Sequence, residues 1–204
     1  MPLVVPHSGP RVILGLMTFG PDEKEGARIT SLDEFKKCLD CLTANNFYEI
    51  DTARIYVGGQ QEAFTAQAGW RDRGLKIATK WYPRNAGDHK PEVIRQNLEK
   101  SLKELQTDCV DIFYLHAADR SVPSRYFKDA TFDALRIIEP VAQKHNLTLI
   151  EIALRWVCYH SALNIKDGGN DGIIVGVSSL KQLEGNLADI KRGPLPEEVV
   201  ATLE

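Results

Sequence analysis

Glu49-Ile50-Asp51-Thr52-Ala53-Arg54-Ile55-Tyr56 is the most informative stretch of the sequence, because a short apolar strand pattern ends there on a carboxylate. Two later stretches have the same form, Ile77-Ala78-Thr79-Lys80 and Val110-Asp111-Ile112-Phe113-Tyr114-Leu115-His116. Each ends on a polar or charged residue of a kind that is uncommon in buried strands. The carboxyl ends of strands in a parallel α/β barrel converge on one face. We therefore expect Asp51, Lys80 and His116 to meet at one mouth.

Strand and helix patterns alternate around these stretches. Apolar strand patterns cover residues 11–16, 47–50, 75–79 and 109–115. Amphipathic helix patterns separate them: a capping box, Ser31-Leu32-Asp33-Glu34, opens one, and Pro91 opens another. Apolar strands that alternate with helices predict a parallel sheet covered by helices.

The alternation stops after Leu115. Residues 117–128 have a loop composition, and two helical patterns follow in succession over residues 130–144 and 147–160. A last strand pattern covers residues 173–177, and a helix pattern opens at Ser178. The sequence therefore predicts five strands, and five parallel strands cannot close a barrel of this kind.

The overall composition excludes several classes of partner. The formal net charge is −3 and the isoelectric point about 6.0, which argues against a nucleic-acid or anionic-membrane partner. No apolar run approaches the roughly 20 residues that span a bilayer, and the first residues do not resemble a signal peptide. We expect a cytoplasmic protein without a membrane partner.

The four cysteines include one Cys-x-x-C pair, Cys38 and Cys41. This spacing can serve metal or redox chemistry, but no second Cys or His pair lies at zinc-site spacing. Both residues fall on the apolar side of a helical pattern. We interpret them as small core residues and expect no metal site.

Asp51, Tyr56, Lys80 and His116 together suit the reduction of a carbonyl group. Hydride addition leaves negative charge on the carbonyl oxygen, so a general acid must protonate it, and Tyr56 is the candidate. A lysine ammonium about 4 Å away would lower the phenol pKa by roughly three units. Asp51 would hold Lys80, and His116 would orient the carbonyl. Each residue alone has a structural interpretation, and the prediction rests on their combination.

At these residues the sequence resembles the aldo-keto reductase superfamily, in particular the aflatoxin-aldehyde (succinic semialdehyde) reductase branch. The resemblance implies a (β/α)8 TIM barrel, an oxidoreductase activity on aldehydes or ketones, and NADPH as the cofactor. It also implies that Asp51, Tyr56, Lys80 and His116 form a catalytic tetrad. Tyr56-Val57-Gly58-Gly59-Gln60-Gln61-Glu62 and Ala153-Leu154-Arg155-Trp156 indicate the branch.

The resemblance also implies positions for cofactor and substrate. The implied cofactor-binding residues are Met17, Thr18, Asp51, Gly176, Ser178, Ser179, Gln182 and Asn186. Hydroxyls and free N–H groups at the start of a helix suit a phosphate, although Ser178 and Ser179 are equally consistent with an ordinary N-cap. Tyr56, His116 and Arg125 are the implied substrate-binding residues.

The resemblance covers the barrel incompletely. Strands 1–4 and 8 are recognisable, and strands 5–7 are missing at about residues 123/124. We expect one barrel domain over residues 1–204, with a first half 1–123 and a C-terminal part 124–204. Two explanations stay open: the sequence contains only the ordered residues of a longer protein, without a mobile middle segment and tail, which we prefer, or the protein itself has a deletion.

Two functions are consistent with these features. The first is an NADPH-dependent reductase acting on a small carbonyl compound, for which the resemblance implies a homodimer. The alternative is a truncated, catalytically impaired NADPH-binding barrel that serves as a non-enzymatic or regulatory subunit. The intact tetrad favours the enzyme, whereas the missing positions around the nicotinamide favour the binding subunit.

Overall fold

The computed structural model describes residues 9–85, 87–116, 129–164, 169 and 171–204. By their contacts these residues form two compact units. Within the described ranges, the first unit contains residues 12–116 and 174–184, and the second contains residues 9–11, 129–173 and 185–204. The single domain over residues 1–204 stays a prediction, and the junction near Pro123 lies outside the described residues.

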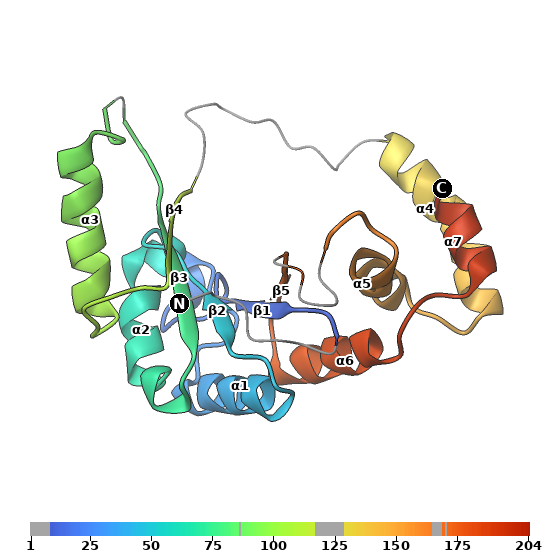
Figure 1. Cartoon of the computed structure of the whole chain (residues 1–204), viewed down its shortest axis with the longest axis horizontal. Helices are drawn as coiled ribbons and strands as arrows, with labels where there is room; N and C mark the ends of the chain where they lie inside the picture. Colours follow the sequence, from blue (N-terminus) through green and yellow to red (C-terminus); the bar gives the residue numbers. More distant parts are fainter. Residues whose placement is uncertain (1–8, 86, 117–128, 165–168, 170) are drawn as a thin grey trace. The chain divides into compact units, whose positions relative to one another are not determined.

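The first unit is built around a five-stranded sheet with the strand order β4-β3-β2-β1-β5 (Figure 1). Its strands are β1 (Val12–Gly15), β2 (Glu49–Asp51), β3 (Lys76–Trp81), β4 (Ile112–Leu115) and β5 (Ile173–Gly176). The pairs β1–β2, β2–β3 and β3–β4 are parallel. The predicted α/β class and the five strand signals are confirmed.

The register of the sheet sets the direction of the site residues. Asp51 pairs with Ala78, and Lys80 pairs with Tyr114 two positions further along β3 and β4. Because side chains alternate along a strand, Asp51, Ala78 and Lys80 point to the same face, which we call the inner face. The opposite, outer face carries buried residues such as Ile77 and Leu14.

Helices α1 (Leu32–Ala44), α2 (Gln61–Gln67) and α3 (Pro91–Glu104) lie on the outer side of the sheet (Figure 1). Ser31 caps α1, because its Oγ accepts a hydrogen bond from the Glu34 N–H. The apolar face of α1 is buried, and the Phe35 ring lies 4.7 Å from the Phe19 ring and 5.5 Å from the Phe64 ring. Pro91 opens α3 as predicted.

The Cys-x-x-C pair lies within α1. Cys38 is fully buried, and burial is the main cause that raises its thiol pKa to about 12, so this thiol is inert at neutral pH. Cys41 is half-buried, and neither residue forms a disulfide. The interpretation as a core residue is confirmed for Cys38.

The second unit is helical. It contains α4 (Asp129–Lys144), α5 (Leu149–Tyr159), the C-terminal part of α6 (Leu180–Lys191) and α7 (Glu197–Leu203). Its buried hydrophobic cluster consists of Ala142, Ile152, Leu195 and Val199. The predicted succession of two helices after the fourth strand is therefore confirmed, with α5 beginning two residues later than expected.

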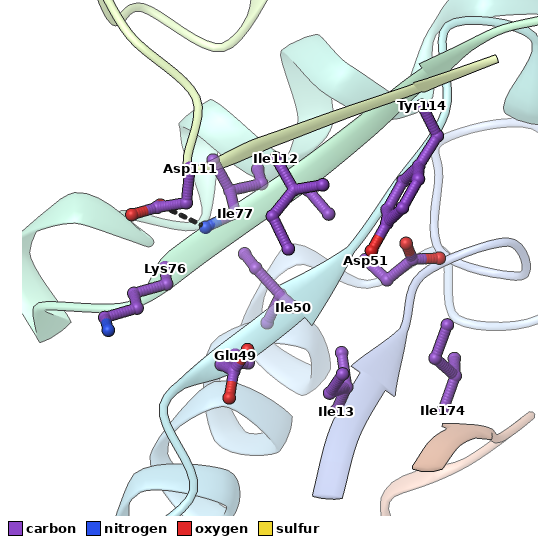
Figure 2. Close-up of a pocket in the computed structure, with 11 residues that line it drawn as sticks. Ile13, Glu49, Ile50, Asp51, Lys76, Ile77, Asp111, Ile112, Tyr114 and Ile174 are labelled. Carbon is purple, nitrogen blue, oxygen red and sulfur yellow. Dashed lines mark hydrogen bonds between the residues drawn. The ribbon is translucent and has the colours of Figure 1, made fainter. Parts of the chain in front are cut away.

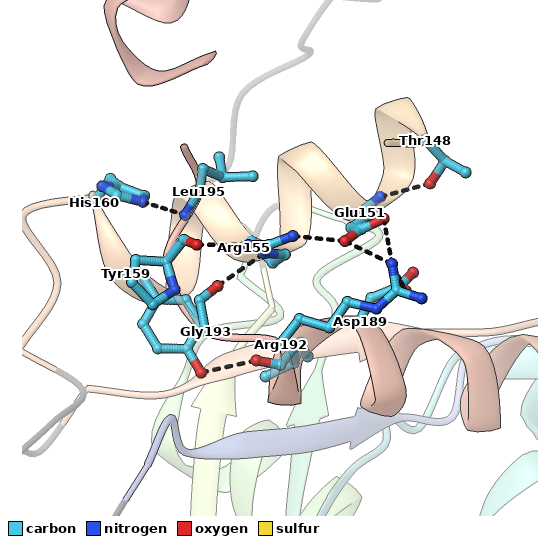
Figure 3. Close-up of polar contacts among 11 residues, drawn as sticks. Thr148, Glu151, Arg155, Tyr159, His160, Asp189, Arg192, Gly193 and Leu195 are labelled. Carbon is cyan, nitrogen blue, oxygen red and sulfur yellow. Dashed lines mark hydrogen bonds and ion pairs between the residues drawn. The ribbon is translucent and has the colours of Figure 1, made fainter. Parts of the chain in front are cut away.

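Side chains of α5 hold the end of α6 and the turn after it (Figure 3). Arg155 bonds the Glu151 carboxylate at 2.6 Å, and also donates to the carbonyls of Gly193 and Pro194. Tyr159 donates to the Ile190 carbonyl at 2.7 Å. These bonds satisfy carbonyl groups at a helix end that would otherwise lack partners.

Within the described residues, β4 and β5 form the two edges of the sheet, and no further strand pairs with either. Tyr114, Leu115 and Ile174 on these strands are 44%, 55% and 55% exposed, an unusual state for large apolar side chains of a barrel. Five strands with open edges agree with an incomplete barrel. Among the described residues, no helix is both long and apolar enough to cross a membrane.

Candidate active site

Three of the predicted side chains meet at the carboxyl end of β2 and β3. Asp51 is the last residue of β2, Lys80 lies near the end of β3, and Tyr56 begins the short helix η2 (Tyr56–Gly59). The Lys80 ammonium nitrogen lies 2.5 Å from Asp51 Oδ2, 2.7 Å from the Thr52 carbonyl oxygen and 3.5 Å from the Tyr56 hydroxyl. The ammonium also lies 5.2 Å from the centre of the Tyr56 ring.

His116 completes this group from the next strand. It follows β4, and its backbone N–H donates to the Trp81 carbonyl at 2.9 Å. Its ring stands edge-on to the Tyr56 ring at 5.5 Å and to the Tyr82 ring at 5.6 Å. The structure therefore brings together all four residues predicted from the strand ends and the loop after β2.

The electrostatics of Tyr56 differ from the expectation. Burial of the phenol, with a smaller contribution from the Asp51 carboxylate, raises the pKa of Tyr56 to about 12. The predicted lowering of this pKa by Lys80 is wrong for this arrangement. Burial of the phenol outweighs the ammonium, which lies 2.5 Å from the Asp51 carboxylate and 3.5 Å from the phenol, so the carboxylate offsets much of its charge.

His116 is held neutral by the same surroundings. Burial first, and then the Lys80 ammonium, lower the pKa of its imidazole, while Asp51 opposes the shift. A neutral imidazole has one N–H donor and one acceptor nitrogen. Its N–H can therefore donate a hydrogen bond to a carbonyl oxygen.

Two buried polar atoms of this mouth have no partner within the described part of the chain, Asp51 Oδ1 and His116 Nδ1. Buried polar atoms are normally satisfied, so each is suited to a group supplied by a ligand. Asp51 also borders a pocket on the inner face, which Ile13, Tyr114 and Ile174 line as well (Figure 2).

The turn that presents Tyr56 has an unusual backbone. Val57 has φ 48° and ψ 55°, and Gly58 and Gly59 follow with φ 60° and 87°. A left-handed conformation is rare for a β-branched residue and marks local strain. Val57 is nevertheless 4% exposed and is packed so closely against Gly20 that a Cβ there would lie 2.8 Å from a Val57 methyl carbon.

The residues that the resemblance assigned to the cofactor lie at the end of β2, in the segment after β1, and from the end of β5 into α6. Met17 is 61% exposed, and the Thr18 hydroxyl donates to the Val177 carbonyl. Gly176 ends β5 and faces open space. Gln182 and Asn186 lie one turn apart on α6.

The start of α6 does not offer all of the expected free N–H groups. The Ser178 N–H donates to Gln182 Oε1 at 2.7 Å, and the Gln182 N–H donates to Ser179 Oγ at 3.2 Å. The Leu180 N–H donates to the Glu34 carboxylate at 3.2 Å. The expectation of free donors is therefore wrong for Ser178, Leu180 and Gln182, because side chains of the protein already accept from them.

One predicted residue cannot be placed, and three were not predicted. Arg125 lies outside the described residues. Arg54 and Glu62 form an ion pair beside the Tyr56 turn, at 3.2 Å, and Tyr82 contacts His116. Arg54 lies within the motif that identified Asp51 and Tyr56, so its position could have marked it as a site residue. Glu62 looked like an ordinary helix carboxylate.

The α/β sheet brings a phenol, an imidazole and an Asp–Lys pair together at the carboxyl ends of its strands, as the sequence predicted for an oxidoreductase of the barrel type. The chain belongs to the aldo/keto reductase family: the model of this family matches residues 11–136 and 125–204. The two matched segments overlap at residues 125–136, close to the predicted break at residues 123/124.

Relatives of known sequence support this assignment. An aldo-keto reductase of Pseudocercospora fijiensis is 27% identical over 282 aligned positions, which cover 81% of this chain and 95% of the relative. Because 282 exceeds the 204 residues of the chain, the relative contains a stretch without counterpart here. Human aflatoxin B1 aldehyde reductase member 4 is 38% identical over 120 residues, 56% of this chain and 34% of that protein.

Solved structures share the fold. An aldo-keto reductase of Klebsiella pneumoniae in complex with NADPH has a TM-score of 0.57 at 21% identity, covering 96% of this chain and 90% of that chain. A thermostable aldo-keto reductase, Tm1743, has a TM-score of 0.64 at 18% identity, covering 95% of this chain and 94% of that chain. At these identities the likeness concerns the fold alone.

Proposed function

We propose that this chain reduces aldehydes or ketones to alcohols with NADPH as the cofactor, and that Tyr56 donates the proton. The observation that carries the proposal is the arrangement of Lys80, whose ammonium bonds Asp51 at 2.5 Å and reaches the Tyr56 hydroxyl at 3.5 Å. NADPH supplies the hydride for the carbonyl carbon when it is bound. The chain's own residues must hold the carbonyl and deliver the proton.

Tyr56 is suited to act as the general acid. With a pKa raised to about 12, its phenol is fully protonated at neutral pH. The oxygen of a carbonyl under reduction acquires alkoxide character, and an alkoxide is a stronger base than a phenolate. The proton therefore moves downhill from Tyr56 Oη to that oxygen.

Lys80 and His116 stabilise the charges that this transfer creates. The Lys80 ammonium lies 3.5 Å from the Tyr56 oxygen, which becomes a phenolate oxygen when the proton leaves. The ammonium therefore interacts more strongly with Tyr56 after the transfer than before. His116, neutral and partly unpartnered, can donate to the carbonyl oxygen and fix its direction. Arg125 remains the proposed contact for a polar end of the substrate.

The mouth fits the reacting end of a nicotinamide nucleotide. Asp51 Oδ1, buried and unpartnered, can accept from a ribose hydroxyl. Met17 and Thr18, in the segment after β1, and Gly176, at the end of β5, would line the cofactor. Ser178, Ser179, Gln182 and Asn186 would hold its adenosine end. There the Ser178 N–H is bonded to Gln182 and the Leu180 N–H to the Glu34 carboxylate. Both bonds must break before these N–H groups can bind a phosphate.

The direct test is the oxidation of NADPH, followed at 340 nm, with 4-nitrobenzaldehyde or 2-carboxybenzaldehyde. We expect turnover by the wild-type protein and its loss in Tyr56→Phe. Equal rates for the two proteins would show that Tyr56 is not the acid.

A second function has one observation in its favour. The exposed Tyr114, Leu115 and Ile174 on the open sheet suit a chain that lacks part of its barrel and acts as a non-enzymatic NADPH-binding subunit. NADPH binding detected by fluorescence, without turnover of any carbonyl, would favour it. An intact mass near 22.8 kDa would support a protein that truly lacks the segment, and a larger mass would restore the complete barrel.

A cytoplasmic location and a homodimer remain further proposals from the sequence. Size-exclusion chromatography with light scattering tests the dimer.

A further inference from the structure

Arg54 stands in the loop between Asp51 and Tyr56, and its guanidinium closes the turn that follows. Nη1 donates to the Gly59 carbonyl at 2.8 Å and to Glu62 Oε2 at 3.2 Å. The backbone N–H of Arg54 donates to the Lys80 carbonyl at 3.0 Å. One residue thus ties both sides of the Tyr56 turn together and joins them to β3.

Glu62 extends this connection to the strand that carries Lys80. Its carboxylate is fully buried, and Oε1 accepts a hydrogen bond of 2.7 Å from the Thr79 hydroxyl. Thr79 is also fully buried and directly precedes Lys80 on β3. The Glu62 carboxylate therefore bonds the Tyr56 turn through one oxygen and the Lys80 strand through the other.

The turn needs such support because its backbone is strained. Val57, next to Tyr56, has a left-handed conformation that β-branched residues rarely adopt. Strained conformations persist when the surrounding structure enforces them, and they cluster at functional sites. The Arg54 bond to Gly59 spans this strained segment from one end to the other.

We propose that Arg54 and Glu62 are a positioning pair that holds the strained turn so that the Tyr56 phenol stays beside Lys80. The inference rests on the proposed function, since it assumes that Tyr56 is the proton donor. Neither residue contacts the reacting atoms. Their effect on the reaction passes through Tyr56.

The test uses Arg54→Met, with Arg73→Met as a matched control. Arg73 makes bonds of the same kind, to the Asp40 carboxylate at 2.7 Å and to the Ala68 and Gly69 carbonyls at 2.9 Å, but its turn carries no proposed catalytic residue. We expect kcat to fall at least tenfold in Arg54→Met, with a smaller change in KM, and to stay within twofold in Arg73→Met.

A double variant shows whether Arg54 acts through Tyr56. Arg54→Met combined with Tyr56→Phe should be no slower than Tyr56→Phe alone, because the residue that Arg54 positions is already disabled. Wild-type kcat in Arg54→Met, or losses that add in full in the double variant, would overturn the proposal. If Arg54→Met does not fold, Glu62→Gln, which keeps the shape of the side chain and removes its charge, takes its place in both comparisons.

Hydrogen exchange separates this inference from the proposed function. Backbone amides of residues 56–60 should exchange faster in Arg54→Met than in the wild type, and at the wild-type rate in Arg73→Met. If the wild-type protein turns over no carbonyl, the proposed function fails, but faster exchange still supports the positioning role. Unchanged exchange in this segment would contradict it whatever the activity.

Discussion

The ammonium of Lys80 lies 2.5 Å from the carboxylate of Asp51, and the two side chains are only 13% and 6% exposed. Lys80→Met would leave a buried carboxylate without its partner, which costs about 3 kcal/mol in comparable cases. We expect such a loss in the free energy of unfolding in urea, and partial recovery in the double variant with Asp51→Asn. The control is Lys144→Met, which breaks an exposed pair with Glu198 and should cost much less, because solvent screens the pair. Equal costs for the two lysine variants would contradict the buried pair.

The raised pKa of Tyr56 predicts the pH dependence of activity. If this pKa is about 12, the phenol keeps its proton from pH 6 to 9, and kcat for carbonyl reduction should show no loss caused by Tyr56 ionisation in that range. A phenol made acidic by Lys80 would instead lose its proton near neutrality, and kcat would fall already above pH 7. A pH–rate profile of kcat under NADPH saturation distinguishes the two cases.

The same shift affects stability at alkaline pH. An unfolded tyrosine ionises near pH 10, whereas Tyr56 in the folded state stays protonated until about pH 12. Between these values the unfolded state binds fewer protons, so stability is lost as the pH rises from 10 to 12. Tyr56→Phe should therefore lose less stability than the wild type over this interval, measured by urea unfolding at successive pH values. Parallel curves would refute the shift.

Gly20→Ala should disturb the Tyr56 turn from its other side. The added methyl group would lie 2.8 Å from a Val57 methyl carbon, so Val57 must move. Overpacking of this kind costs about 1–3 kcal/mol, and we expect kcat to fall along with the unfolding free energy. Gly185→Ala is the comparison for stability: this glycine lies within α6 in open space, so alanine should stabilise by up to about 1 kcal/mol. A Gly20→Ala protein as stable and active as the wild type would show that this contact is not tight.

Arg155 should contribute to the stability of the helical unit. Its side chain is 8% exposed and bonds Glu151 together with two backbone carbonyls (Figure 3). Arg155→Met should cost about 1–3 kcal/mol in chemical denaturation, because the Gly193 and Pro194 carbonyls lose their donor, whereas Glu151 keeps its bonds to Arg192. Arg136→Met removes an exposed pair with Asp133 in the same unit and should change the free energy of unfolding by less than about 0.5 kcal/mol. The prediction fails if both arginine variants unfold at the same denaturant concentration.

The positions of the candidate site could be predicted because parallel strands align their ends. Asp51, Lys80 and His116 each stand at the end of a recognisable apolar pattern, and pairing in register brings such ends together. Tyr56 followed from its short distance to Asp51 along the chain. The family resemblance pointed to the same residues.

The contacts between side chains could not be predicted in the same way. The pKa of Tyr56 is raised first by the burial of its phenol and then by the Asp51 carboxylate, and the strand-end pattern reveals neither the burial nor that Lys80 lies closer to Asp51 than to the phenol. Glu34 looked like the second half of a capping box, yet its carboxylate accepts from Leu180, 146 residues later. Glu62 had the appearance of a solvent-exposed helix residue, because nothing in its neighbours along the chain reveals Arg54 and Thr79 beside it.

The most direct measurement is the single-turnover rate of 4-nitrobenzaldehyde reduction with NADPH, compared between the wild type, Tyr56→Phe and Tyr48→Phe. The account predicts that Tyr56→Phe loses roughly 100-fold to 10,000-fold, the usual contribution of a general acid, whereas Tyr48→Phe keeps the wild-type rate. A wild-type single-turnover rate in Tyr56→Phe would contradict the central claim that the phenol beside Lys80 is the source of the proton.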